Sequence, residues 1–450
     1  MQQVIFLYDF LLFPFYLVIF YLVVRKKARK YSGTPLRKFF LLAFWLHMSG
    51  AIFISFLMQY YYGYGDSFAY YAGGNVIRHM IGKNLSSIKY LFYSGEDLVS
   101  AAEALGYGDQ IPIQMTGNAN AFVMKVSGII SYFSFNSFLV ISLFFGFFSF
   151  IGTWKLFYVF KELNKRRHIR LLGYATICTP SLWLWGSGLL KEPICIGALG
   201  LSVFIIYNML IRRQFSLKGL LLVVLLFYAI TIVKNYIIII FLVAVSLVLI
   251  MRLFSSIKNI VLRIASIILF FCMVTISLIN IGADRYKDEL VDLSYSQIEN
   301  FKNNYEAVQT DDEDNKAGFT IGDINPTFSS LLLNSPWVIA SCLFRPFIWE
   351  SRKIIILFAA LEAFLILLIT LFVFFKTKFL GFFYYALNDP YRFFCFIFSM
   401  LFALLIGYTT YNFGTMIRYK IIFLPFYFFL LINIYTIIKL KKDKAAVQPQ

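Results

Sequence analysis

The stretch Tyr60-Tyr-Tyr-Gly-Tyr-Gly-Asp-Ser-Phe-Ala-Tyr-Tyr71 follows directly after an apolar run, residues 38–59. Gly63 and Gly65 precede Asp66, and glycine lets a chain turn sharply and lets a ligand approach the backbone closely. The stretch therefore places one carboxylate just beyond the end of an apolar segment. What that carboxylate can do depends on the class of protein and on the side of a membrane that it faces.

The composition of the chain indicates an integral membrane protein. Of its 450 residues, 60% are hydrophobic and only 14% are charged, which is more apolar surface than a soluble core of this length can bury. We therefore expect an all-α polytopic membrane protein. The net charge of +18 is explained by basic cytoplasmic loops, so nucleic acid is not expected as a partner. The five cysteines are scattered, without metal-ligand or disulfide spacing, and are expected to be buried thiols.

Apolar runs of sufficient length predict about 11 transmembrane helices, since a helix needs about 20 residues to cross the hydrocarbon. The first run has no basic region before it and is expected to be a retained span. The expected spans are residues 3–24, 38–59, 134–154, 171–189, 194–211, 218–233, 235–251, 262–281, 354–375, 393–410 and 419–438.

The distribution of charge predicts the orientation, because short cytoplasmic loops are rich in Lys and Arg. The basic run 25–38 places the N-terminus outside and the C-terminus in the cytoplasm. In this topology the inside segments hold 26 of the 41 basic residues, and the outside segments 60–125 and 282–353 hold 17 of the 23 acidic ones. The two distributions agree on one topology.

The region 218–251 allows two interpretations, one overlong span or two short spans with Lys234 and Asn235 at the turn. A single span would place the basic residues of 252–263 outside, so two spans are expected.

One transmembrane domain, residues 1–438, is expected, followed by a basic cytoplasmic tail, 439–450. Its large outer loops are 60–133 and 282–353. Residues 75–93 alternate apolar and basic side chains and predict a helix lying in the membrane interface. Residues 328–349 are apolar and interrupted by Pro336 and Pro346, which indicates a re-entrant or interfacial segment.

Asp66 is the first candidate for chemistry. A carboxylate at this position can deprotonate an acceptor hydroxyl as a general base. The alternative is that Asp66 caps the helix that follows it.

Further candidates are single charges at the predicted outer ends of spans, where charge is costly and usually has a partner or a substrate. Lys191 and Glu192 are expected in a tight outer hairpin, where Lys191 can bind phosphate or both charges can simply be solvated. Arg345 can clamp phosphate oxygens or can pair with Glu350 as a structural anchor.

The last predicted span begins at residue 419, and Asn412, Arg418 and Lys420 lie around its start. Arg418 lies outside against the positive-inside trend, which favours an anion as its partner; the alternative is that its side chain reaches to the interface.

Other charged residues suggest no complete site. Glu362 and Lys234 are predicted within or near the membrane and could pair with each other or mark a proton path. The acidic run 311–314 could attract a divalent cation, the one cofactor that the sequence suggests, but it lacks the spacing of a calcium loop and is expected to be a solvated loop. No metal site is assigned.

The stretch Gly65-Asp-Ser-Phe-Ala-Tyr-Tyr71, directly after an apolar span, resembles the first outer loop of polytopic glycosyltransferases of the GT-C class. The phrases around Lys191-Glu192, Phe344-Arg-Pro-Phe-Ile-Trp-Glu350 and Asn412-Phe-Gly-Thr-Met-Ile-Arg418 resemble those of bacterial membrane proteins found with surface-polysaccharide genes. The chain departs from the GT-C pattern in that an extra span precedes the acidic loop and no large soluble C-terminal domain follows.

The resemblance implies transfer of a sugar from a polyprenyl-phosphate donor to a glycan, lipid or protein acceptor at the outer face of the bacterial cytoplasmic membrane. Asp66 would be the base, and Lys191, Arg345 and Arg418 would hold the phosphate. Two alternatives stay open. One is a polymerase or ligase of polysaccharide repeat units, which depends more on Arg345 and Arg418 than on Asp66. The other is a transporter of lipid-linked glycan, which concentrates charges and broken helices near the midplane.

Overall fold

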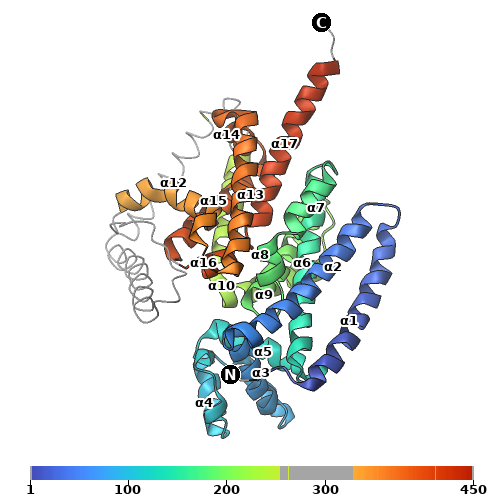
Figure 1. The fold of residues 1–450 in the computed structure, drawn as a ribbon, viewed down its shortest axis with the longest axis vertical. Coiled ribbons are helices and arrows are strands. Elements are labelled where there is room, and N and C mark those ends of the chain that lie inside the picture. Colours follow the sequence, from blue (N-terminus) through green and yellow to red (C-terminus); the bar gives the residue numbers. More distant parts are fainter. Residues whose placement is uncertain (1–2, 254–261, 263–327, 352, 411, 448–450) are drawn as a thin grey trace. The chain divides into compact units, whose positions relative to one another are not determined.

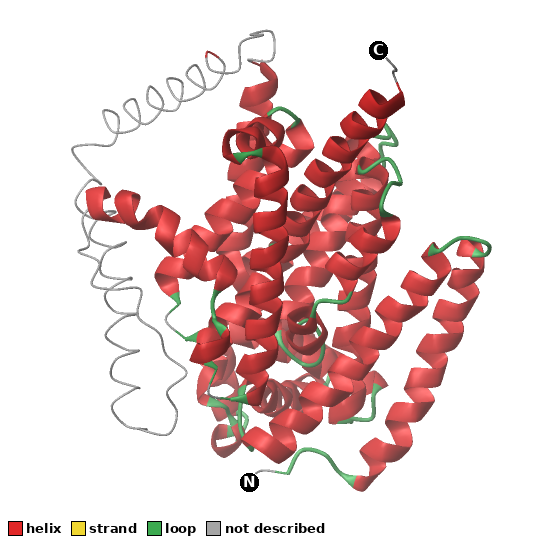
Figure 2. Cartoon of the chain, turned by 45° about the horizontal axis from the view of Figure 1, so that its top comes forward, coloured by secondary structure: helices red, strands yellow, loops and turns green. Residues whose placement is uncertain are grey.

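The computed structural model describes residues 3–253, 262, 328–351, 353–410 and 412–447 (Figure 1). In these parts of the chain the regular structure is helical and contains no strand (Figure 2). The expected class of polytopic helical membrane protein is therefore confirmed. The predicted span 262–281 and the acidic run 311–314 lie outside the described residues, apart from residue 262.

Eight helical segments in the described parts are long and apolar enough to cross a membrane. They are Leu7–Tyr31, Leu36–Tyr62, Phe138–Leu163, Lys191–Leu210, Leu217–Leu253, Ile354–Thr377, Pro390–Thr409 and Leu424–Lys441. Seven of them match single predicted spans, and Leu217–Leu253 covers both 218–233 and 235–251. The predicted span 171–189 has no counterpart among them.

The chain divides into two compact units, Met1–Ile238 (unit 1) and Ile239–Gln450 (unit 2). The helices of unit 1 are α1 (Leu7–Ala28), α2 (Leu36–Phe56), α3 (Asp66–Ile81), α4 (Gly95–Ala104), α5 (Asn118–Phe133), α6 (Phe138–Leu163), α7 (Ile169–Ile177), α8 (Pro180–Trp185) and α9 (Lys191–Leu210). Helix α10 (Leu217–Leu253) begins in unit 1 and ends in unit 2. The helices of unit 2 are α12 (Phe328–Phe344), α13 (Ile354–Thr377), α14 (Phe379–Leu387), α15 (Pro390–Thr409), α16 (Phe413–Lys420) and α17 (Leu424–Val447). That the chain forms one transmembrane domain stays a prediction.

The core of unit 1 is helix α6, which packs between α2 and α9. Along α2 and α6 the contacting residue numbers run in opposite directions, since Phe40 meets Trp154 and Ser55 meets Ser142. The two helices are therefore antiparallel. Along α6 and α9 the contacting residue numbers rise together, since Gly152 meets Gly197 and Tyr158 meets Phe204. These two helices are therefore parallel.

Three glycines bring α6 and α9 into backbone contact. A Cβ added to Gly152 would lie 2.4 Å from the Cα of Gly197, and one added to Gly200 would lie 2.2 Å from the Gly152 carbonyl oxygen. Small residues let helices in a membrane approach closely, where van der Waals contact replaces the hydrophobic effect as the source of association. These glycines therefore fix how far α9 is displaced along α6.

The segment predicted as span 171–189 is instead two short helices, α7 and α8, followed by the non-helical residues 186–190. Thr179 has an extended conformation and Pro180 begins α8, because the residue before a proline is disfavoured in helical geometry. Gly188 has φ of +79°, a conformation that favours glycine. These residues break the apolar run into pieces too short to cross a membrane.

Helix α10 is interrupted at Lys234, whose φ of −153° and ψ of 82° are not helical. Over its 37 residues a straight helix would extend about 55 Å at about 1.5 Å per residue, nearly twice the roughly 30 Å of hydrocarbon. The break lies at the residue where the sequence predicts a turn between two short spans. That the chain crosses the membrane twice here stays a prediction.

The connection after α2 has the sharp exit that its glycines predict. Gly63 has φ of +70° and Gly65 has φ of +139°, and Asp66 is the first residue of α3. The interfacial helix predicted for 75–93 begins earlier and is interrupted, because α3 ends at Ile81 and a 3₁₀ helix, Leu85–Phe92, starts after Asn84. The Asn84 side chain accepts from the Ser87 backbone and caps this second helix.

We expect Gly152→Val to destabilise the protein, because the new side chain would meet the backbone of α9 and not a movable side chain. Overpacking of this kind costs about 1 to 3 kcal/mol. The measurement is thermal unfolding of purified protein in detergent, where the variant should melt several degrees below wild type. The control is Gly381→Ala in α14, where the new Cβ meets only the Thr377 Cβ at 3.6 Å. An unchanged melting temperature in Gly152→Val would show that α6 and α9 do not pack through these glycines.

Candidate functional site

The N-terminal end of α9 lies well inside unit 1. Lys191 begins α9 six residues before Gly197, and in parallel helices this corresponds to the level of Gly146 on α6. A Cβ on Gly146 would lie 3.0 Å from the carbonyl oxygen of His47 in α2. Helix α9 therefore starts level with the middle of the Leu36–Tyr62 span.

The segment that leads into α9 reaches the same depth. The Trp183 indole N–H donates to the Ser49 hydroxyl over 3.0 Å. A Cβ on Gly50 would lie 2.0 Å from the Trp183 carbonyl oxygen and 2.9 Å from the Ser187 hydroxyl. Gly50 is twelve residues before Tyr62, so this contact is about 18 Å along α2 from the end that leads to Asp66.

A buried ion pair occupies this interior position. The Lys234 ammonium donates to the Glu192 carboxylate over 2.9 Å, and the two side chains are 5% and 0% exposed. Glu192 lies in the first turn of α9, and Lys234 lies at the interruption of α10. The first turn of one helix and the interruption of another thus each contribute one member of the pair.

This finding corrects the interpretation of Lys191 and Glu192. Both alternatives placed them in an outer hairpin at the surface, but Glu192 is fully buried and Lys191 is half-buried in the same turn. The sequence interpretation was wrong because it took 171–189 as a complete span. A span of that length would have carried residue 191 to the membrane surface.

Asp66 follows the C-terminal end of α2, whereas the N-terminal end of α2 is basic. The side chain of Asp66 is half-buried. The N-cap of α3 is Gly65, which provides no side chain, and Asp66 follows it in the first turn. A carboxylate in the first turn interacts favourably with the helix dipole. The structure therefore places Asp66 beside the α3 N-terminus without making it the capping residue.

In unit 2, Arg345 and Glu350 form an ion pair between the end of α12 and the start of α13. The Arg345 Nε lies 3.0 and 3.2 Å from the two Glu350 carboxylate oxygens, and Arg345 Nη2 donates to the same carboxylate. Glu350 also accepts from the Phe347 backbone N–H over 2.8 Å. The alternative in which Glu350 anchors Arg345 is thus what the structure contains.

Helix α16 adds a second cation to this position. The buried Lys420 donates to the Arg345 carbonyl oxygen, and the Arg345 guanidinium lies 5.5 Å from the centre of the Phe413 ring. We call Arg345, Glu350, Phe413 and Lys420 the Arg345 cluster. Lys420 precedes the span that starts at Leu424, and burial lowers the pKa of its ammonium to about 8.

The other two candidates of this region lie on or next to α16. The Asn412 side chain accepts from the Gly414 backbone N–H over 2.7 Å and from that of Thr415, so it is the N-cap of α16. Arg418 is half-buried two residues before Lys420. The structure thus gives Asn412 a structural role and brings Arg345, Glu350 and Lys420 together.

Two features were missed by the sequence interpretation. The partnership of Glu192 with Lys234 could not be found, because it joins residues 42 positions apart through helix packing. Lys420 was noticed only as one of three polar residues near residue 419, although its place amid apolar sequence is the usual sign of a buried cation. Among the described residues no group of three or more His, Cys, Asp or Glu side chains could hold a metal ion.

Comparison of the chain with family models, with curated proteins and with solved structures gives no match.

We expect Glu192→Gln to destabilise unit 1 strongly, because it leaves the Lys234 ammonium buried without its carboxylate. Removing one member of a buried pair costs about 3 to 5 kcal/mol. The double variant Glu192→Gln/Lys234→Gln should recover a large part of this loss, since neither side chain then carries a charge. The measurement is thermal unfolding of the four proteins of this cycle. A double variant whose loss equals the sum of the two single losses would show that the charges are not coupled.

Proposed function

We propose that this protein is a membrane glycosyltransferase that moves a sugar from a polyprenyl-phosphate-linked donor to an acceptor during cell-surface glycan assembly. The observation that carries the proposal is the Arg345 cluster, in which two cations meet at the ends of apolar helices. The active face would be the outer face of a bacterial cytoplasmic membrane, with the N-terminus outside.

A lipid-linked sugar phosphate needs cationic groups beside an apolar surface, and the cluster supplies both. Glu350 and Phe413 hold the Arg345 guanidinium from its edge and its face. A guanidinium held in this way is preorganised to bind phosphate oxygens, which arginine does bidentately. In the transfer step the same cations stabilise the negative charge that develops on the departing phosphate.

The acceptor hydroxyl requires a base, and Asp66 is the residue proposed for this role. Its half-buried carboxylate follows two glycines of positive φ and begins α3. The positive φ of Gly63 and Gly65 lets the chain turn sharply just before this carboxylate. Asp66 would take the proton from the acceptor as that oxygen attacks the sugar, which is general base catalysis.

A transporter of lipid-linked glycan is the second candidate, and the Glu192–Lys234 pair favours it. Transporters place ionisable groups at interrupted helices near the middle of the membrane. The N-terminus of α9, the non-helical residues 186–190 and the interruption at Lys234 have this character. A polymerase or ligase of repeat units is the closest enzymatic alternative and would depend mainly on Arg345 and Arg418.

We expect Asp66→Asn to reduce transfer at least about a hundredfold, which is the usual contribution of a general base. The measurement is transfer of labelled sugar from a synthetic polyprenyl-phosphate donor by purified protein in lipid. Asp109→Asn is the matched control, because Asp109 is an exposed carboxylate of the same connection. Full activity in Asp66→Asn would remove this residue from the mechanism.

We expect Arg345→Gln to raise the KM for the lipid-linked donor and to lower kcat, because Arg345 would hold both the bound phosphate and the departing one. Loss of a charged hydrogen bond of this kind costs about 1.5 to 3 kcal/mol, or roughly tenfold or more in kcat/KM. Lys376→Gln, which removes an exposed cation at the end of α13, is the control.

The two substitutions together separate the candidates. Activity that survives in Asp66→Asn and is lost in Arg345→Gln would favour the polymerase. Lipid-linked glycan that crosses the membrane of wild-type vesicles, with no transfer from any donor tested, would favour the transporter.

A further inference from the structure

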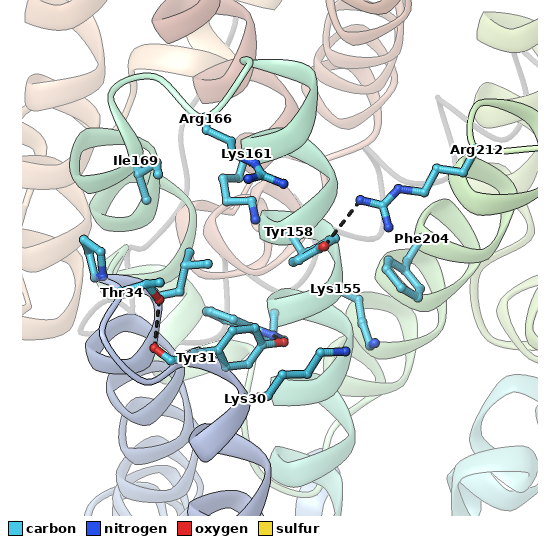
Figure 3. Close-up of a pocket in the computed structure, with 13 residues that line it drawn as sticks. Lys30, Tyr31, Thr34, Lys155, Tyr158, Lys161, Arg166, Ile169, Phe204 and Arg212 are labelled. Atoms are coloured by element: carbon cyan, nitrogen blue, oxygen red, sulfur yellow. Dashed lines mark hydrogen bonds between the residues drawn. The ribbon is translucent and has the colours of Figure 1, made fainter.

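A cavity of about 430 Å³ lies at the end of unit 1 that carries the α1–α2 connection (Figure 3). This volume is within the range of small-molecule sites, about 300 to 1,000 Å³. Its walls come from the α1–α2 connection, from the last three turns of α6 and from α7, α9 and the loops that join them. Five of the lining residues are basic: Lys30, Lys155, Lys161, Arg166 and Arg212.

Lys30 and Lys155 are two of the five basic residues that line this basic cavity. Figure 3 shows their amino ends directed toward one another, and the two charges are close enough to repel. The Lys155 ammonium lies 4.0 Å from the centre of the Phe204 ring. Within the described residues Lys155 forms no ion pair, so the positive charge on this side of the cavity is not balanced by a carboxylate.

The other three basic residues of the cavity, Lys161, Arg166 and Arg212, share one carboxylate, that of Glu162. Glu162 lies 2.7 Å from the Lys161 ammonium, 3.4 Å from Arg166 and 3.9 Å from Arg212. Lys161 is itself buried. Like charges held close together repel unless an anion joins them, and one glutamate balances only one of these three. The side chains of Arg166 and Arg212 are 68% and 33% exposed, so an anion from solvent or from a headgroup can reach them.

Aromatic side chains hold these cations in place. The Arg212 guanidinium donates to the Tyr158 hydroxyl over 3.3 Å, and the Lys161 ammonium lies 4.1 Å from the centre of the Tyr158 ring. The Trp154 indole N–H donates to the Tyr31 hydroxyl over 3.2 Å. Rings therefore hold Lys155, Lys161 and Arg212 in place, whereas Lys30 and Arg166 are exposed. Cations that are already held lose less conformational freedom when an anion binds.

The positive-inside rule explains the number of basic residues here but not their convergence. Lys26 and Lys38 lie at the ends of α1 and α2, are exposed and do not line the cavity, and a topology signal requires no more than that. Lys155 and Lys161 lie on α6 and line the cavity, where Lys155 is half-buried and Lys161 is buried. Cations on a helix that face a cavity imply a ligand as well as an orientation.

We propose that this basic cavity binds a phosphate group, either the headgroup of an anionic phospholipid or a soluble phosphorylated compound. Phosphate supplies several oxygens that can meet Lys30 and Lys155 on one side and Arg212 on the other. The cavity shares no lining residue with those assigned to glycosyl transfer. The two proposals can therefore be tested independently.

The test compares wild-type protein with Lys30→Gln/Lys155→Gln, which keeps a polar side chain at both positions and removes two charges. Two probes are used with the full chain in nanodiscs: pyrophosphate, followed by calorimetry in phosphatidylcholine, and phosphatidylglycerol, followed by mass spectrometry of the lipid that stays bound. The affinity for the true ligand should fall about tenfold or more in the variant. Binding should also weaken as salt concentration rises.

The control is Lys26→Gln/Lys38→Gln, which removes the same number of lysine charges from exposed positions on α1 and α2 that do not line the cavity, and it should bind as wild type does. Pyrophosphate binding that only the cavity variant loses assigns a soluble phosphorylated ligand. Retention of phosphatidylglycerol that only the cavity variant loses, without pyrophosphate binding, assigns the lipid headgroup. Equal binding by all three proteins, or equal loss in the control, would overturn the proposal.

Discussion

The ion pair between Glu192 and Lys234 is the interaction on which the interior of unit 1 depends. Each charge alone would be very costly in an apolar bundle, and the pair is tolerated because its members meet directly. The chain brings them together by starting α9 inside the bundle and by interrupting α10 at Lys234. The start of α9 and the interruption of α10 thus place the two charges next to each other.

Close backbone packing makes this arrangement possible. Gly152, Gly197 and Gly200 let α6 and α9 touch. The absence of a side chain at Gly50 leaves space for the Trp183 carbonyl in the middle of the α2 span. A larger side chain at any of these contacts would push the segment 183–190 away from α2 or shift α9 along α6. Since α9 carries Glu192, such a shift would also move the carboxylate away from Lys234.

Charge is organised differently in the two units. In unit 1 the interior pair and the basic cavity bring charged side chains together, whereas in the described part of unit 2 the Arg345 cluster does so, where an acidic side chain orients one cation and a backbone carbonyl holds another. A cation held beside apolar helices suits a lipid-linked phosphate. A buried pair between the start of one helix and the interruption of another suits movement of a substrate or of the helices themselves. The proposed transferase uses the first property, and the second is the reason that the transporter remains its main competitor.

The sequence by itself determined the class of protein, most of the long helices, the sharp glycine exit before Asp66 and the position of the break at Lys234, because hydrophobic run length and glycine or charged interruptions are local properties. It also contained a local signal for the basic cavity that was overlooked, since Trp154, Lys155, Tyr158 and Lys161 recur at helical spacing. Only the tertiary structure decided that 171–189 is not a span, that Glu192 meets Lys234 and that Lys420 meets Arg345. These contacts join residues far apart in the chain, and the depth of each residue depends on how glycines let the helices approach, which no hydropathy pattern records.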